Sequence, residues 1–228
     1  MHHLSSSVLF AFVVAAVPEP SIISVKYTGN GCPRNAASYS TSTLDPSSNL
    51  IKLIHYLNEF TPVYGAGIAL RDGQKQCLAT VDIVVDAAYK LRVNNFGTNV
   101  NGYVRLAYLG HDLRITANYT FTTDTSVQVS LKTTVMCSHE KIDGADTSLQ
   151  STSQSIVRGP WNGRFTGSAP VVGNKVGVES SCGGGTLQAI LKADINARGE
   201  GTGGGWVGNP APSEDDWGFM ADIEVLTC

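Results

Sequence analysis

Cysteine is the residue type with the clearest chemistry in this chain. None of the five stands in a Cys-x-x-Cys pair, which is the usual spacing of zinc ribbons and thioredoxin-type redox sites. Widely spaced cysteines in an exported chain usually form disulfides. Since five cannot all pair within one chain, one should be free or bound to another molecule. The five are Cys32, Cys77, Cys137, Cys182 and Cys228.

Three tryptophans suggest a second chemistry, the stacking of aromatic rings on sugars. They lie in or beside two stretches that we interpret as loops, and flat aromatic rings suit the C–H faces of pyranoses. The alternative is that they fill the ends of a β-sandwich, because tryptophan is highly buried on average. Glycan binding and core packing both remain open for Trp161, Trp206 and Trp217.

Carboxylates would be needed by a glycosidase, as a facing pair about 5 to 10 Å apart. Glu179, Glu200 and Glu214 are the acids that suggest themselves, and no spacing marks two of them as a pair. The run from Glu214 to Asp216 offers oxygen ligands of the kind calcium takes, but a solvated acidic loop explains it as well. We therefore assign no metal site.

Acyl transfer would need an activated nucleophile. Behind the N-terminal segment the chain has His55, His111 and His139, but no Gly-x-Ser-x-Gly nucleophile elbow. The glycine-rich stretch "GEGTGGGWVG" lacks the Gly-Lys-Ser/Thr ending of a phosphate-binding loop. We therefore expect no catalytic residue and no cofactor.

Asn118 opens the sequence Asn-Tyr-Thr, an acceptor for N-glycosylation in secreted proteins. It occupies a polar position in the alternating segment 113–121, so its side chain should point away from the core. We expect a glycan on this asparagine if the chain follows the secretory route. The alternative is an unmodified strand residue.

The N-terminal residues indicate export. Residues 8–17 form an apolar run that is too short to span a bilayer, and the run contains the small residues Ala15 and Ala16. We interpret residues 1–16 as a signal peptide and residues 17–228 as one secreted domain. A buried N-terminal strand is the alternative, since no Lys or Arg precedes the run. No other stretch is long and apolar enough for a membrane helix.

The composition fits an extracellular β-protein. Hydrophobic residues make up 42% of the chain, which argues against disorder. Only 15% of the residues are charged, against about 25% in ordinary globular proteins. The net charge is −3 and no basic block is present, so no nucleic-acid partner is expected.

Alternation of apolar and polar residues predicts half-buried antiparallel strands along most of the chain. The clearest alternations cover residues 81–93, 113–121 and 127–135. Segment 49–60 is open to a helix or a strand, and its Ile and Tyr content favours a strand. Further strand candidates are residues 21–27, 102–109, 186–195 and 220–226.

Turn sequences separate these strands. We expect turns at residues 28–31, 94–102 and 142–146, where Asn-Gly, Asp-Gly and similar pairs occur. Residues 144–163 and 198–218 should be two long loops over one core. The predicted fold class is all-β, a single antiparallel β-sandwich of jelly-roll type.

An ordered set of motifs resembles a known family. The motifs are "TGNGCP", "GAGIALRDGQKQC", "NGYVRLAYLG", "RGPWNGRF" and "ESSCGGGTLQAIL", followed by a C-terminal cysteine. Ala66 and Ser181 stand where the family has prolines. The chain is similar to the secreted domain of unknown function number 4360, which is largely fungal. The resemblance implies secretion, one all-β domain and four framework cysteines, and it implies no established activity.

The resemblance also implies a role for each cysteine. Its framework positions match Cys32, Cys77, Cys182 and Cys228, and we expect neighbours in the chain to pair, as Cys32–Cys77 and Cys182–Cys228. Sequence alone does not fix this connectivity. Cys137 departs from the family pattern, and it is either a buried thiol or one end of an interchain bridge.

These observations favour a non-enzymatic module of the extracellular space or cell surface. Such a module would bind cell-wall or matrix glycans, or would assemble with itself as a structural unit. Sheet edges or Cys137 would then join copies into an oligomer or fibre. The alternative is a secreted hydrolase acting on polysaccharide, which would need two carboxylates facing each other across a groove. A flat face with exposed aromatic rings would favour the binding module.

Overall fold

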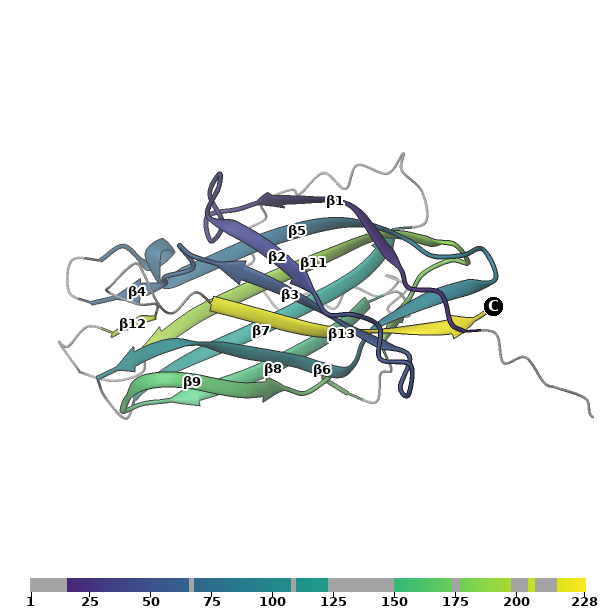
Figure 1. Cartoon of the computed structure of the whole chain (residues 1–228). Helices are drawn as coiled ribbons and strands as arrows, with labels where there is room; N and C mark the ends of the chain where they lie inside the picture. The colour runs from purple at the N-terminus through teal and green to yellow at the C-terminus, as the bar shows by residue number, and fades with distance from the viewer. Residues whose placement is uncertain are drawn as a thin grey trace, which may run out of the picture.

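The chain folds as two antiparallel β-sheets that lie against each other (Figure 1). The computed structural model describes residues 16–65, 68–107, 110–122, 150–173, 177–197, 205–207 and 217–228. These residues include one short 3-10 helix, η1 (Leu70–Gly73), and no helix in them is long and apolar enough to cross a membrane. The prediction of an all-β sandwich is confirmed.

Each sheet mixes strands from distant parts of the chain. Within the described residues, sheet A has the order β1 (Ser21–Thr28), β5 (Gln74–Val84), β11 (Gly184–Ala197), β7 (His111–Thr122) and β8 (Gln150–Arg158). Sheet B has the order β2 (Ala37–Thr41), β3 (Leu50–Leu57), β13 (Trp217–Thr227), β6 (Tyr89–Leu106), β12 (Gly205–Val207) and β4 (Val63–Tyr64). Two further strands, β9 (Trp161–Ala169) and β10 (Val178–Glu179), also pair with β6.

The core lies between the sheets because successive side chains of a strand point to opposite faces. In β7 every second residue is buried, as the alternation predicted: Leu113, Ile115, Ala117, Tyr119 and Phe121. Segment 49–60 contains a strand, β3, whose Ile51, Leu53 and Leu57 are buried. The buried residues of both sheets form one hydrophobic cluster.

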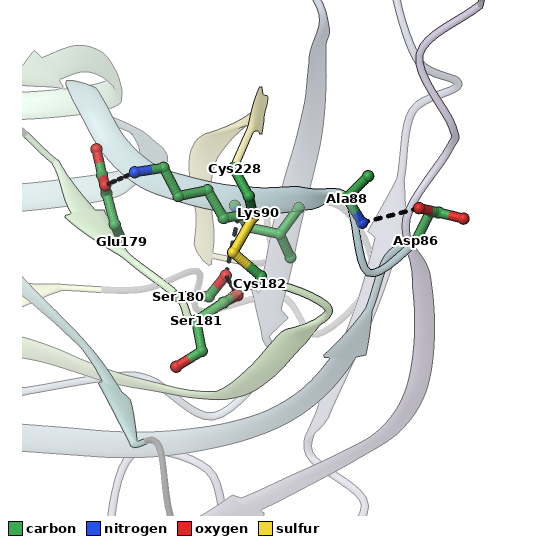
Figure 2. The surroundings of a disulfide bond; sticks show 9 residues. Asp86, Ala88, Lys90, Glu179, Ser180, Ser181, Cys182 and Cys228 are labelled. Atoms are coloured by element: carbon green, nitrogen blue, oxygen red, sulfur yellow. Dashed lines mark hydrogen bonds and ion pairs between the residues drawn. A yellow bond between two sulfur atoms is a disulfide. The ribbon is translucent and has the colours of Figure 1, made fainter.

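The alternation over residues 81–93 does not form a single strand, which corrects the prediction. Residues 85–88 separate β5 from β6, and the Ala88 amide donates to the Asp86 carboxylate at 2.9 Å within this turn (Figure 2). The turn carries the chain from sheet A to sheet B. Val85 still packs against the core, so the apolar pattern runs on through the turn.

The expected turn at residues 94–102 is also wrong, because β6 runs through it. The irregularity is a bulge, where the pairing of β6 with β13 changes register. Asn94 and Gly97 take positive φ angles of 63° and 89° there. Asparagine and glycine are the residues that adopt such angles most readily, so their presence indicated a turn from sequence alone.

Residues 144–163 were expected to be a loop, but from residue 150 onward they form β8 and the start of β9. The inner face of β8 carries Ser151 and Ser153, which are fully buried. Polar residues on a core-facing side hide the apolar alternation on which the prediction relied.

A buried network of hydrogen bonds satisfies the hydroxyl groups of Ser151 and Ser153 in the core. The Asn94 amide donates to Ser151 Oγ at 2.9 Å, and Ser153 Oγ donates to Asn94 Oδ1 at 2.7 Å. Thr98 Oγ1 donates to the same oxygen at 3.0 Å and lies 3.0 Å from Tyr119 Oη. The network therefore joins β6 of sheet B to β7 and β8 of sheet A through the middle of the sandwich.

Two disulfides fasten the sandwich. Cys32–Cys77 ties the turn after β1 to β5, and Cys182–Cys228 ties the start of β11 to the end of β13 (Figure 2). These are the pairs that the family resemblance led us to expect. Each closes a loop of about 45 residues, which restricts the unfolded chain. Cys137, the predicted strand 127–135 and the predicted turn 142–146 lie outside the described residues.

Candidate functional site

One half of the outer face of sheet B is covered with amide, hydroxyl and guanidinium groups. Every second residue of β6 points outward there, and each lies beside an outward residue of β9 in antiparallel register. The pairs are Asn99 with Ser168, Asn101 with Thr166, Tyr103 with Arg164 and Arg105 with Asn162. The turn predicted over 94–102 hid Asn99 and Asn101, and the loop predicted over 144–163 hid Asn162, whereas Tyr103 and Arg105 fell in the predicted strand 102–109 without a function being assigned to them.

The same face continues across β13, β3 and β2. Asn101 pairs with Gly218 of β13, which in turn pairs with Tyr56 of β3. A Cβ placed on Gly218 would lie 2.1 Å from Asn101 Oδ1, so the Asn101 side chain lies over this glycine. Beyond Tyr56, Ser38 is its neighbour on β2. We call this surface, formed by Tyr56, Asn99, Asn101, Tyr103, Asn162, Thr166 and Ser168, the amide–tyrosine face.

Hydrogen bonds hold both tyrosines of this face. Tyr103 Oη donates to Asn162 Oδ1 at 2.9 Å, and Ser40 Oγ donates to Tyr56 Oη at 3.4 Å. Below the face, Gly102 leaves room for the Trp217 indole, which would lie 2.6 Å from a Cβ at that position. The strand segments that form the face contain no Asp or Glu (β2 residues 38–40, β3 54–56, β6 99–105, β9 162–168 and β13 218–220). The described part of the face is therefore neutral to cationic.

The other half of sheet B's outer face is ion-paired. Arg92 of β6 lies between two carboxylates: its Nε donates to Glu179 Oε1 at 2.8 Å, and its Nη1 lies 3.3 Å from Glu224 Oε2. Lys90 Nζ donates to Glu179 Oε2 at 2.6 Å (Figure 2). Hydrogen bonds from Lys90 and Arg92 lower the pKa of Glu179.

Glu179 does not have the property required of a glycosidase's general acid. A general acid needs a raised pKa, so that it is protonated when the substrate binds. Glu179 has the opposite shift, and the Arg92 guanidinium bridges it to Glu224 on one sheet surface. Glu200, Glu214 and the acidic run to Asp216 lie outside the described residues. Among the described residues no three His, Cys, Asp or Glu side chains form a group that could hold a metal ion.

The three tryptophans do not form one surface. The Trp217 side chain is only 1% exposed and packs near Phe60 and Phe219 in the core, so for this residue core packing is the alternative that the structure selects. Trp161 is 40% exposed at the start of β9 and packs edge-on against Phe165. The backbone of Trp206 pairs with Arg105 and Val63, and its side chain lies outside the described residues.

The sequon asparagine points outward from its sheet, whereas the two described histidines point into the core. Asn118 is on the outer face of sheet A, half-buried between the backbones of β11 and β8. His55 and His111 are buried, in β3 and β7 respectively, so neither is a surface base. His55 contacts Tyr27, and His111 packs edge-on against Tyr64.

The fold and this face together define a disulfide-linked, two-sheet β-protein with one polar half-face that has no carboxylate among its described strand residues. The chain belongs to the family described as Domain of unknown function (DUF4360), whose family model matches residues 18–211. No curated protein matches the chain.

Two solved structures are similar to the chain only at a low level. The family 11 xylanase from Neocallimastix patriciarum aligns with 90% of this chain and 100% of that chain, at 12% identity and a TM-score of 0.20. A loop-swap mutant of Xyn11A from the same organism covers the same shares at 10% identity and a TM-score of 0.19. Scores this low carry no argument about fold or activity.

Proposed function

We propose that the mature chain is a secreted, non-enzymatic module that binds extracellular glycans on the amide–tyrosine face. A sugar hydroxyl both donates and accepts hydrogen bonds, and so does an asparagine amide. Asn99, Asn101 and Asn162 place three amides on neighbouring strands, with the Tyr103 ring held among them. Aromatic rings with a polar tip suit a partner that has both apolar and polar faces. This grouping is the observation that carries the proposal.

The ion-paired half of sheet B supports a binding module over a hydrolase. Asp222, another outward acid of β13, pairs in register with Lys52, and burial raises its pKa. A hydrolase that used the two acids joined by Arg92 would use Glu179 and Glu224. Replacing both by glutamine should leave polysaccharide binding unchanged. The same double variant should also leave any trace of hydrolysis unchanged, because Arg92 holds both carboxylates on one sheet surface and not across a groove. A loss of sugar release in this variant would instead favour the hydrolase.

Contacts at the sheet edges support a binding module over a fibre subunit. On one side, Val172 donates its amide to the Thr152 carbonyl at 2.8 Å and Gln154 donates to Pro170 at 3.1 Å, so the outer edge of β8 is partly paired within the chain. On the other side, Tyr27 Oη donates to the Ser38 carbonyl at 2.9 Å and joins the two sheets. The partly paired edge of β8 is a poor template for adding another chain.

Secretion is part of the proposal and has its own test. Disulfides persist in oxidising compartments, and the sequon at Asn118 lies on an outer face. The protein recovered from its native host's medium should begin near residue 17 and should carry a glycan on Asn118. Intact-mass measurement before and after enzymatic deglycosylation checks both points. An unprocessed, fully reduced chain would contradict secretion.

The binding test uses insoluble cellulose, chitin, xylan and β-glucan as ligands. We expect the protein to sediment with at least one of them, and both Asn101→Ala and Tyr103→Ala to weaken that binding about tenfold or more, since loss of about 1.4 kcal/mol of contact energy has this effect. Thr152→Ala and Gln154→Ala, on the outer face of sheet A, are the matched controls and should bind as the wild type does. Equal binding by all four variants would exclude this face.

A further inference from the structure

Asn118 belongs to a row of outward side chains that crosses the described strands of sheet A from β1 to β8. Thr152 of β8 is its register partner on one side, and Ile190 of β11 is its partner on the other. The row continues from Ile190 to Leu78 of β5 and then to Thr28 of β1. The chain neighbours of Leu78, Ile190 and Asn118 are buried on both sides, so these three side chains point away from the core.

Two neighbouring members of this row, Leu78 and Ile190, are apolar, and we call them the apolar strip. Both are half-buried. Because neighbouring strands lie about 4.8 Å apart, the strip begins about 5 Å from Asn118 and ends about 10 Å from it. The adjacent rows are polar or charged: Thr80, Gln188, Thr120 and Gln150 on one side, and Gln76, Lys192, Thr116 and Gln154 on the other. The strip is therefore a narrow apolar surface with polar borders, directed toward the sequon asparagine.

A tethered sugar chain suits this surface better than a separate protein does. A stable protein interface buries about 800 Å² on each partner, which two half-buried side chains do not supply. The ring C–H groups and the acetyl methyl of an N-acetylated sugar are apolar, whereas its hydroxyls donate and accept hydrogen bonds, as the bordering glutamines and threonines do. A glycan on Asn118 would also meet the strip within one molecule, so even a weak contact would be populated.

We propose that the glycan on Asn118 lies along this row toward β5, with its first sugars over Ile190 and Leu78, and forms an outer layer on sheet A. The inference rests on the glycosylation that is part of the proposed function. In the other direction the row holds Thr152, and β8 is the last described strand of the sheet, so a glycan turned that way would gain no apolar contact in the row. A covered sheet A leaves the amide–tyrosine face of sheet B as the surface for extracellular glycans.

The test is a double-mutant cycle on the melting temperature of the oxidised, mature protein secreted by a eukaryotic host. Removing the glycan with Asn118→Gln should lower the melting temperature by about 3 °C in the wild-type background and by less than about 1 °C in the Ile190→Thr background. Ile156→Thr makes the same substitution at a 43% exposed position of β8 on the same outer face, beside Arg114 and outside the row. In this matched control the full shift should remain.

Three further measurements separate the possible failures. An intact mass without a glycan on Asn118 would overturn both this inference and the glycosylation on which it rests. A glycosylated chain whose melting temperature is unchanged by Asn118→Gln, or falls equally in the wild-type and Ile190→Thr backgrounds, would overturn the inference alone. The same cycle in protein made in a bacterial periplasm without N-glycosylation should show no coupling, and a coupling that persists there would assign the effect to the asparagine itself. Polysaccharide binding by Asn118→Gln should equal that of the wild type, because the amide–tyrosine face lies on the other sheet.

Discussion

Replacing Asn94 with alanine is expected to lower the free energy of unfolding by about 4 kcal/mol. The Asn94 side chain makes three hydrogen bonds in the middle of the core, to Ser151, Ser153 and Thr98. Its loss would leave these buried hydroxyls with a missing partner, and each unsatisfied buried group costs about 1 to 3 kcal/mol. Urea denaturation of the oxidised protein, with both disulfides intact, measures the change.

A glycine at position 94 separates the effect of the lost hydrogen bonds from the effect of backbone strain. Asn94 has a φ of 63°, and an alanine in this left-handed region would add about 1 kcal/mol of strain that glycine avoids. Asn94→Gly should therefore be destabilised nearly as much as Asn94→Ala, because both remove the amide. If Asn94→Gly stays within about 1 kcal/mol of the wild type, the hydrogen bonds contribute little and backbone strain explains the alanine variant.

The parts of the fold that sequence predicted well are those whose inner faces are wholly apolar. β7 and β11 alternate without exception in their central residues, and β13 follows the same rule, whereas a bulge between Ile22 and Ser24 interrupts the alternation of β1. β8 was missed because Ser151 and Ser153 occupy inner positions, which only their contacts with Asn94 explain. Those contacts join strands far apart in the chain, so no local window of sequence contains them.

The candidate site was harder to predict than the fold. The polar residues of β6 alternate with the buried Val100, Val104 and Leu106, and this alternation was the signal that could have placed Asn101 on a strand. The Asn and Gly residues of the bulge masked it. For the tryptophans, sequence left burial and exposure open, and only packing decides that Trp217 is buried under Gly102 while Trp161 is exposed.

Acid is expected to destabilise the protein through His55. Its Nδ1 lies 2.9 Å from Tyr27 Oη, whose single proton is donated to the Ser38 carbonyl, so Nδ1 is the nitrogen that donates to the tyrosine. Nε2 then carries a lone pair, and this atom is buried without a partner in the described part of the chain. Protonation would place a charge there, and burial lowers the pKa of His55 from 6.5 to about 4.

The sign of the pH effect follows from this lowered pKa. The unfolded chain takes up the proton near pH 6.5, whereas the folded protein does so only near pH 4. The stabilisation is therefore complete above about pH 6.5 and is lost as the pH falls toward about 4, with a total loss of about 3 kcal/mol. Urea midpoints between neutral pH and pH 4 measure it.

The pH dependence of stability, compared between the wild type and His55→Gln, separates the contribution of His55 from that of the carboxylates. Glu179 and Asp82 have lowered pKa values, so their contribution also falls in acid, whereas the raised pKa values of Asp194 and Asp222 act in the opposite direction. His55→Gln keeps these carboxylates and removes only the buried titration, so its stability should vary less with pH even if it is lower overall. Parallel pH profiles for wild type and variant would show that His55 is not the acid-sensitive group. A flatter profile for the variant would identify the contact between Tyr27 and His55, which bridges β1 of sheet A and β3 of sheet B, as an inter-sheet contact that weakens in acid.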